Sequence, residues 1–268
     1  MRIDILTVFP EMFDSVLNTS ILGRAREKGL IDVRCRDIRP YSDMKHKNTD
    51  DYPFGGGAGM LMTAQPIADC IRAVEAEKAA EEAAGEGAKE QEQENPCASP
   101  EKKCKRIYMS PRGVTLTQPL AKELAGEESL MILCGHYEGV DQRVIDKYID
   151  MEISVGDYVL TGGEMAAMVL VDCVSRLIPG VLGSEESPED ESFSGTEGLL
   201  EYPQYTRPRE FEGMEVPQVL LDGDHKKIAR WRRDQSLLVT AQRRPELLKN
   251  AVLDKKDRAF LKENGYEV

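Results

Sequence analysis

The chain has 268 residues, a net charge of −13 at pH 7 and six cysteines, none of them in a C-x-x-C pair. A chain of this length can bury a substantial core in one or two domains without disulfides or a structural metal. No uncharged run approaches the roughly 20 residues of a membrane helix, and the first residues alternate like a strand, unlike a signal peptide. We therefore expect a cytoplasmic protein with no membrane partner.

The negative charge is concentrated in two segments. Residues 75–105 carry nine acidic and five basic side chains, and residues 185–197 carry six acidic and no basic ones. Together these segments hold −10 of the −13 net charge, which leaves −3 for the rest of the chain. The overall charge therefore does not exclude a nucleic-acid partner, which would need a locally basic face.

Strand-like and helix-like segments alternate along the first half of the chain. The predicted strands begin at Ile3, Ile31, Arg106 and Ser129, and the predicted helices begin near Pro10, Ala64, Thr117 and Val140. This alternation favours an α/β domain with a largely parallel sheet. Residues 75–104 are rich in Glu, Ala and Lys, which predicts a helix that outgrows its core and becomes a disordered insertion at about 78–104.

A second change in composition follows Ile178. Residues 183–197 are rich in Ser, Glu, Pro and Gly, which indicates a flexible linker after a domain of residues 1–182. Residues 198–268 predict a small helical domain. From Tyr205 onward, fourteen basic and eleven acidic residues make this domain locally positive. Its cations fit either a solvated helix face or contact with phosphate.

The densest glycine cluster, Y-P-F-G-G-G-A-G-M-L-M, begins at Tyr52. Its glycines would let backbone amides approach an anion, but no Lys-Ser or Lys-Thr follows, so a P-loop is excluded. The G-x-G-x-x-G spacing after a strand is also missing, which disfavours a dinucleotide fold. A flexible substrate loop and a bare turn are equally good interpretations. Lys45, His46 and Lys47 nearby favour a polyanionic substrate slightly.

Three predicted strands end in turn residues. The segments are I-Y-M-S-P-R-G from Ile107, L-C-G-H-Y-E-G from Leu133 and S-V-G-D-Y-V-L-T-G-G-E from Ser154. Ligands of open α/β sheets lie at the carboxyl ends of strands, so these loops predict one pocket. Backbone groups dominate in the loops, which indicates a neutral or amphipathic ligand. His136 is more simply a surface or hydrogen-bonded residue than a catalyst, and with only His46, His136 and His225 in the chain no metal cluster is expected.

Taken in order, these motifs closely resemble the bacterial tRNA (guanine-N1)-methyltransferases, the TrmD family of the SPOUT class. That family modifies the guanine just 3′ of the anticodon. The resemblance rests on F-P-E-M-F from Phe9, G-G-G-A-G-M-L-M from Gly55, Y-M-S-P-R-G from Tyr108, C-G-H-Y-E-G-V-D-Q-R-V from Cys134, S-V-G-D-Y-V-L-T-G-G-E from Ser154, S-R-L-I-P-G-V-L-G from Ser175 and E-Y-P-Q-Y-T-R-P from Glu201. It covers nearly the whole chain, and only the acidic insertion looks foreign to it.

The resemblance implies a fold that composition does not predict. This fold is a SPOUT domain with a deep trefoil knot and a mostly parallel sheet, followed by a small all-helical C-terminal domain. A homodimer with active sites shared between the subunits is implied as well. The methyl donor S-adenosyl-L-methionine would bind among the knot loops. By resemblance, its contacts are Tyr108, Met109, Ser110, Pro111, Gly135, Glu138, Val155, Gly156, Asp157, Tyr158, Val159, Leu160, Gly162 and Gly163.

Methylation of guanine at N1 requires a base, because the N1 proton must leave while the lone pair lines up with the methyl group. A guanidinium can stabilise the charge that collects on O6, and Arg176 matches the active-site arginine of the family. In the family an aspartate precedes a Ser-Phe pair, whereas here Glu191 precedes Ser192 and Phe193. Asp190 lies one position earlier. We expect Glu191 to be the base by register, and Asp190 is the alternative.

The resemblance places the anticodon arm of tRNA between the knot domain of one subunit and the helical domain of the other. The expected tRNA contacts are Lys45, His46, Gly55, Gly57, Gly59, Arg230 and Arg233. No DNA partner and no protein-bound metal are expected, and a Mg²⁺ requirement stays open at this stage. Two other functions fit: a SPOUT-like enzyme that methylates a ribose 2′-hydroxyl, and a protein that binds donor and RNA but lost catalysis with the change to glutamate.

Overall fold

The computed structural model describes residues 1–86, 104–183, 191–194 and 198–267. The chain divides into two compact units, Met1–Gly183 and Ser184–Val268. Most of the predicted acidic insertion, most of the predicted linker and the candidate base Asp190 lie outside the described residues. Within the described part, no helix is both long and apolar enough to span a membrane.

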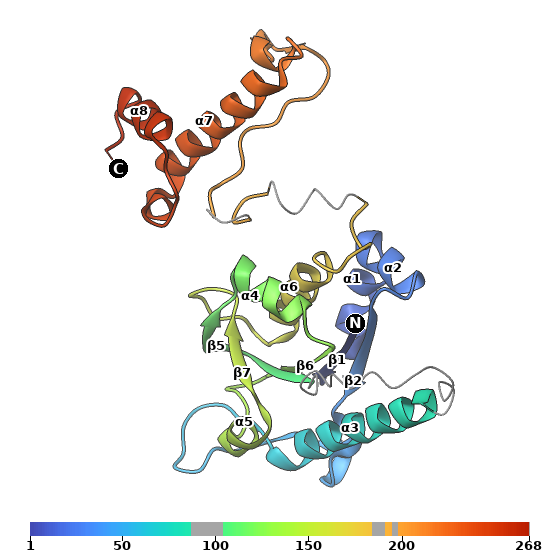
Figure 1. The fold of residues 1–268 in the computed structure, drawn as a ribbon. Helices are drawn as coiled ribbons and strands as arrows, with labels where there is room; N and C mark the ends of the chain where they lie inside the picture. The colour runs from blue at the N-terminus through green and yellow to red at the C-terminus, as the bar shows by residue number, and fades with distance from the viewer. Residues whose placement is uncertain (87–103, 184–190, 195–197, 268) are drawn as a thin grey trace, which may run out of the picture. The chain divides into compact units, whose positions relative to one another are not determined.

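A five-stranded sheet forms the centre of the first unit (Figure 1). Its strands are β1 (Arg2–Thr7), β2 (Asp32–Asp37), β5 (Lys105–Thr115), β6 (Ser129–Cys134) and β7 (Met151–Ser154). Their order is β2-β1-β6-β5-β7, and every pairing in this sheet is parallel. All six residues of β6 are buried, as expected for a central strand covered on both faces. The predicted α/β class with a mostly parallel sheet is confirmed.

Helices cover both faces of this sheet (Figure 1). One face packs against α2 (Ser20–Glu27), α4 (Gln118–Ala125) and α6 (Glu164–Ser175), and the other against α3 (Ala64–Glu86) and α5 (Gln142–Tyr148). Because side chains alternate along a strand, Ile3 and Ile5 of β1 belong to the first core and Leu6 to the second. The first unit is therefore a three-layer α/β/α domain.

Short elements complete the first unit. They are α1 (Asp14–Leu17), the two-stranded hairpin of β3 (Asp50–Asp51) and β4 (Leu61–Met62), and 3-10 helices at Pro10–Phe13, Arg39–Tyr41 and Lys45–Lys47. Side-chain caps explain where two of the helices that cover the sheet begin. The Thr117 side chain accepts a hydrogen bond from the Leu120 amide before α4, and Asp141 accepts one from the Arg143 amide before α5.

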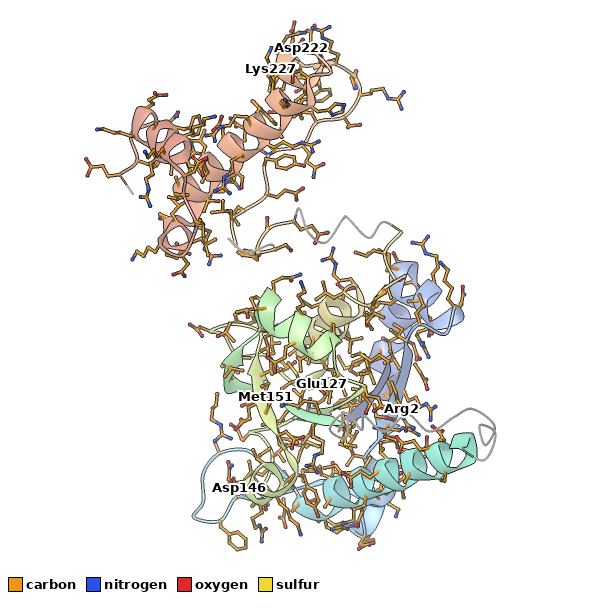
Figure 2. The ribbon with its side chains drawn as sticks, viewed as in Figure 1. Arg2, Glu127, Asp146, Met151, Asp222 and Lys227 are labelled. Carbon is orange, nitrogen blue, oxygen red and sulfur yellow. The ribbon has the colours of Figure 1, made fainter. Side chains whose placement is uncertain are left out.

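Helix α3 continues into the segment that was predicted to be a peripheral insertion. Charged groups hold this part of α3 on the sheet edge: Arg2 and Arg34 each pair with Glu77 and Glu81, and Arg36 pairs with Glu77. Arg2 is labelled beside α3 in Figure 2. Lys78 also donates a hydrogen bond to Ser129 Oγ at 2.6 Å. The helix therefore continues to Glu86, and ion pairs at Glu77 and Glu81 hold its middle part against β1 and β2.

The second unit is mainly helical and contains α7 (His225–Arg243), α8 (Lys255–Glu263) and 3-10 helices at Gln218–Leu220 and Pro245–Lys249. Leu237, Leu248 and Leu261 lie in its core. It also contains an antiparallel hairpin of β8 (Glu210–Phe211) and β9 (Met214–Glu215). An all-helical domain was expected. The difference arises at Glu212 and Gly213, whose φ values of 53° and 81° suit a two-residue hairpin turn.

Candidate active site

The carboxyl ends of three neighbouring strands meet at one edge of the sheet. Strands β6, β5 and β7 are adjacent and parallel, so the segments that follow them lie side by side. These segments and the first turn of α6 line a single cavity. The predicted convergence of the three strand-end loops on one pocket is confirmed.

All but one of the residues expected to bind the methyl donor line this cavity. They are Tyr108, Met109, Ser110, Pro111, Gly135, Glu138, Val155, Gly156, Tyr158, Val159, Leu160, Gly162 and Gly163. The exception is Asp157, an exposed residue of the same loop. Sequence reasoning missed Tyr137, Gly139, Ile153, Ser154, Thr161 and Ala166, and it assigned no role in the pocket to His136. In the sequence, only their position between or next to the predicted residues indicated that they could line the pocket.

Backbone contacts hold the cavity walls together. The Gly163 amide donates a hydrogen bond to the Gly135 carbonyl at 2.7 Å, and His136 pairs with Gly162 in an isolated bridge. A side chain at Gly163 would not fit, because its Cβ would lie 2.8 Å from Cys134 Cα. The loop after β6 and the start of α6 therefore approach as closely as only glycine allows.

The glycine-rich segment reaches the rim of the same cavity. The Glu138 amide donates to the Met60 carbonyl at 3.0 Å, and a Cβ at Gly59 would overlap the Glu138 side chain. Gly55, Gly57 and Gly59 are exposed, and each has a positive φ. The structure thus brings one group of predicted tRNA contacts next to the predicted donor pocket. Lys45 and His46 are exposed on their short 3-10 helix.

Burial raises the pKa of two groups in or next to the cavity, the Tyr108 phenol and the Cys134 thiol. Burial raises the pKa of the Tyr108 phenol, and the nearby Glu152 carboxylate raises it further. Burial also raises the pKa of the Cys134 thiol well above its usual value. A protonated thiol is a weak nucleophile, so Cys134 is not suited to covalent catalysis. Within the described residues, no three His, Cys, Asp or Glu side chains gather where they could hold a metal ion.

Neither of the predicted catalytic residues that the structure describes lines this cavity. Arg176 is in the same unit but at the far end of α6, and Glu191 is in the second unit. Arg176 follows the last residue of α6, whereas Gly163 and Ala166, at the start of that helix, line the cavity. The 12 residues of α6 span about 18 Å, so Arg176 does not reach the cavity of its own chain. Glu191 belongs to the second unit, where the Glu201 amide donates a hydrogen bond to Ser192 Oγ at 2.9 Å.

The two arginines expected to contact tRNA form ion pairs inside the second unit. Arg230 and Arg233 each bind the Asp257 carboxylate at 2.9 Å, and Arg230 also binds Asp234 at 2.5 Å. Burial alone would raise the pKa of Asp257, but hydrogen bonds from Arg233, the Asp254 amide and Arg230 hold it below its usual range. These pairs join α7 to α8. Contact of the two arginines with tRNA phosphate stays a prediction.

Other cations and aromatic rings of the second unit lie at its surface. Lys227, labelled in Figure 2, and Arg232 are exposed on α7. The Arg232 guanidinium lies 4.9 Å from the Tyr202 ring centroid, and the half-exposed Tyr205 ring lies 6.3 Å from Trp231. Interleaved cations and aromatic rings are typical of surfaces that bind single-stranded nucleic acid. Sequence reasoning quoted the E-Y-P-Q-Y-T-R-P motif but did not single out these tyrosines.

The first unit is a three-layer α/β/α domain with a parallel sheet, and a glycine-lined cavity lies at the carboxyl ends of its strands. These features are typical of an α/β protein that binds a ligand at that edge of the sheet. The family model described as tRNA (guanine-1)-methyltransferase TrmD matches residues 1–250. The chain belongs to this family.

Individual relatives match over almost their whole length. A tRNA (guanine-N(1)-)-methyltransferase of Alkaliphilus metalliredigens is 54% identical over 263 residues, which cover 98% of each chain. The protein of the same name from Geotalea uraniireducens is 54% identical over 98% of this chain and 96% of its own. The one from Clostridium perfringens is 52% identical over 98% of this chain and 99% of its own.

Proposed function

We propose that this protein transfers the methyl group of S-adenosyl-L-methionine to N1 of the guanine just 3′ of the anticodon in tRNA. The products are 1-methylguanosine and S-adenosylhomocysteine. The family match over residues 1–250 and the names of the relatives support this reaction. The observation that carries the proposal is the cavity at the sheet edge, because three of the motifs that resemble the family, those from Tyr108, Cys134 and Ser154, contribute residues that line it.

The lining of the cavity suits an amphipathic donor. Its glycine-rich loops offer backbone amides and carbonyls as polar groups. The side chains of Met109, Ile153 and Leu160 give the cavity an apolar surface. Such a mixture of apolar surface and a few fixed polar groups is typical of small-molecule sites. The residues that would hold S-adenosyl-L-methionine are the cavity-lining residues named above, and Asp157 would contribute from the exposed part of its loop.

Glu191 would act as the general base. Its carboxylate takes the guanine N1 proton while N1 forms a bond to the methyl carbon and the carbon–sulfur bond breaks, with its electron pair left on sulfur. The Arg176 guanidinium stabilises the negative charge that moves onto guanine O6. Asp190 is the alternative base, since a shift of one residue in the linker would exchange the two carboxylates.

A homodimer with shared active sites would bring Arg176 to a donor. Met165 and Val169 of α6 are 54% and 51% exposed, and Arg176, just after the helix, follows on the same side about two turns beyond Val169. If this apolar face packs antiparallel against its copy, a two-fold axis places Arg176 of one chain near the start of α6 of the other. The distance between Arg176 and its own cavity supports this arrangement.

The finer features of the fold belong to the same proposal. Residues 1–182 would form the knotted SPOUT methyltransferase domain, residues 183–197 the linker and residues 198–268 the tRNA-binding domain. The anticodon arm would contact the glycine-rich segment, Lys45, His46 and the cations of α7. A cytoplasmic location is supported by the five cysteines of the described chain, all of which are free thiols.

One assay tests the reaction. The protein is incubated with S-adenosyl-L-methionine and an unmodified tRNA transcript that carries guanine 3′ of the anticodon, and the digested nucleosides are identified by mass spectrometry. A matched transcript with adenine at that position is the control. We expect 1-methylguanosine from the first transcript only. A ribose-methylated nucleoside would support a 2′-hydroxyl methyltransferase instead, and the absence of any methylated nucleoside would refute the proposal.

A further inference from the structure

A buried carboxylate lies directly behind the wall of the cavity. Glu164 is the first residue of α6 and is 2% exposed, and its neighbours Gly163 and Ala166 line the cavity. Its Oε1 accepts a hydrogen bond from Thr7 Oγ1 at 2.8 Å. The Thr7 hydroxyl in turn accepts one from the Phe9 amide at 2.9 Å. One carboxylate oxygen is therefore anchored to the end of β1.

The other carboxylate oxygen faces a histidine that lines the cavity. Glu164 Oε2 lies 4.0 Å from His136 Nδ1, which is too long for a hydrogen bond. His136 Nδ1 is buried and has no hydrogen-bond partner among the described residues. The imidazole packs edge-on against Phe9 and Tyr137, with 5.0 Å between ring centroids in each case. Buried polar atoms normally have hydrogen-bond partners, so His136 Nδ1 can form a further hydrogen bond when a partner comes within reach.

Gly162 keeps the space between the two side chains open. A Cβ at this position would overlap Glu164 Oε2 and lie 2.7 Å from His136 Nδ1. Gly162 itself lines the cavity and pairs with His136 in the isolated bridge. A side chain at position 162 would therefore fill the space between Glu164 Oε2 and His136 Nδ1, and glycine leaves that space open.

We propose that Glu164 is a positioning residue that tightens the donor pocket through His136. When the donor binds, the imidazole moves toward Glu164 and its Nδ1–H donates a hydrogen bond to Oε2. A hydrogen bond to a carboxylate is stronger than one between neutral groups, so it holds residues 135–139 against residues 162–164. The inference rests on the proposed function, because it takes S-adenosyl-L-methionine to be the ligand of this cavity.

A purely structural role for Glu164 predicts something different. A carboxylate in the first turn of a helix interacts favourably with the helix dipole, and this interaction needs no histidine. In that case, substitution of Glu164 lowers the melting temperature but leaves donor affinity unchanged. Coupling between Glu164 and His136 in donor affinity is the property that only the positioning role requires.

The test is a double-mutant cycle on the full-length protein, with S-adenosyl-L-methionine binding measured by calorimetry. Glu164→Met keeps the length of the side chain and removes both acceptors, and His136→Phe keeps the ring packing and removes Nδ1. We expect each single substitution to weaken binding about tenfold and the double variant to be no weaker than either. Glu164→Gln retains an acceptor oxygen and should bind within about threefold of the wild type.

Two outcomes would overturn the inference. Either the losses multiply to about a hundredfold in the double variant, or Glu164→Met binds donor as the wild type does. If Glu164→Met does not fold, Thr7→Val replaces it in the cycle, because it releases Oε1 at nearly constant volume. It should then weaken binding only when His136 is present. Failure of the wild type to bind donor would instead refute the proposed function, whereas donor binding with uncoupled losses refutes this inference alone.

Discussion

The ion pairs around Asp257 predict a large change in the stability of the second unit. Asp257 is 3% exposed, and it accepts hydrogen bonds from Arg230 and Arg233 and from the Asp254 amide. Its own amide donates to Asp254 Oδ1 at 2.7 Å in the capping box of α8. Asp257→Asn leaves two guanidinium groups without their shared carboxylate.

The size of the effect follows from this burial. Removing one partner of a buried ion pair destabilises a protein by about 3–5 kcal/mol. The two arginine side chains are still 33% and 26% exposed, so water replaces part of the lost interaction. We therefore expect a loss of about 3 kcal/mol. For a unit of this size, a loss of that magnitude lowers the melting temperature by about 12 °C or more.

Trp231 makes this measurement specific. It is the only tryptophan of the chain and lies on α7, so its fluorescence reports on the second unit. Urea unfolding of the full chain is followed at this residue for the wild type and Asp257→Asn. Glu246→Gln, which removes an exposed partner of Arg244, is the control and should leave the transition unchanged. An Asp257→Asn transition within about 1 kcal/mol of the wild type would refute the structural role of these pairs.

Three further predictions concern catalysis, assembly and pH. Glu191→Gln should slow methyl transfer in a single turnover by about a hundredfold or more without changing donor affinity. If Glu191→Gln reacts at the wild-type rate and Asp190→Asn reacts slowly, Asp190 is the base instead. Mixed chains of Arg176→Ala and Gly163→Ala should regain activity that neither variant has alone, and no recovery would contradict a shared site. Because the pKa of Asp257 is lowered in the folded state, its stabilisation is present above about pH 4 and disappears as the pH falls through the lowered value. Trp231 fluorescence should show this acid loss in the wild type and not in Asp257→Asn.

The layers of the first unit could be predicted because each strand and helix carries its own pattern. The short apolar run S-L-M-I-L-C from Ser129 is typical of a strand buried on both faces, and all six residues are buried in β6. The pocket followed from topology, since the turn residues after three parallel strands had to meet at one edge. His136 behind that edge was judged a surface residue, because a sequence does not reveal that Glu164, 28 positions later, is its neighbour.

The partners of charged residues could not be predicted from the sequence. Glu77 and Glu81 look like solvated helix positions, yet three arginines of β1 and β2 hold them. In the second unit, the family resemblance implied phosphate contacts for Arg230 and Arg233, and these contacts stay a prediction. A carboxylate more than twenty positions away takes both guanidinium groups. Sequence periodicity identifies the apolar face of a helix, but it does not assign partners to charges that come together only in the folded chain.

The central claim is that the cavity at the carboxyl edge of the sheet binds S-adenosyl-L-methionine. Calorimetric titration of the donor into the wild type and Gly163→Ala tests it most directly, because a Cβ at that position would clash with the backbone of Cys134 and force the two cavity loops apart. We expect saturable binding to the wild type and a loss of at least about tenfold in Gly163→Ala, with both proteins folded. Equal binding to the two proteins, or no binding to the wild type, would contradict the account.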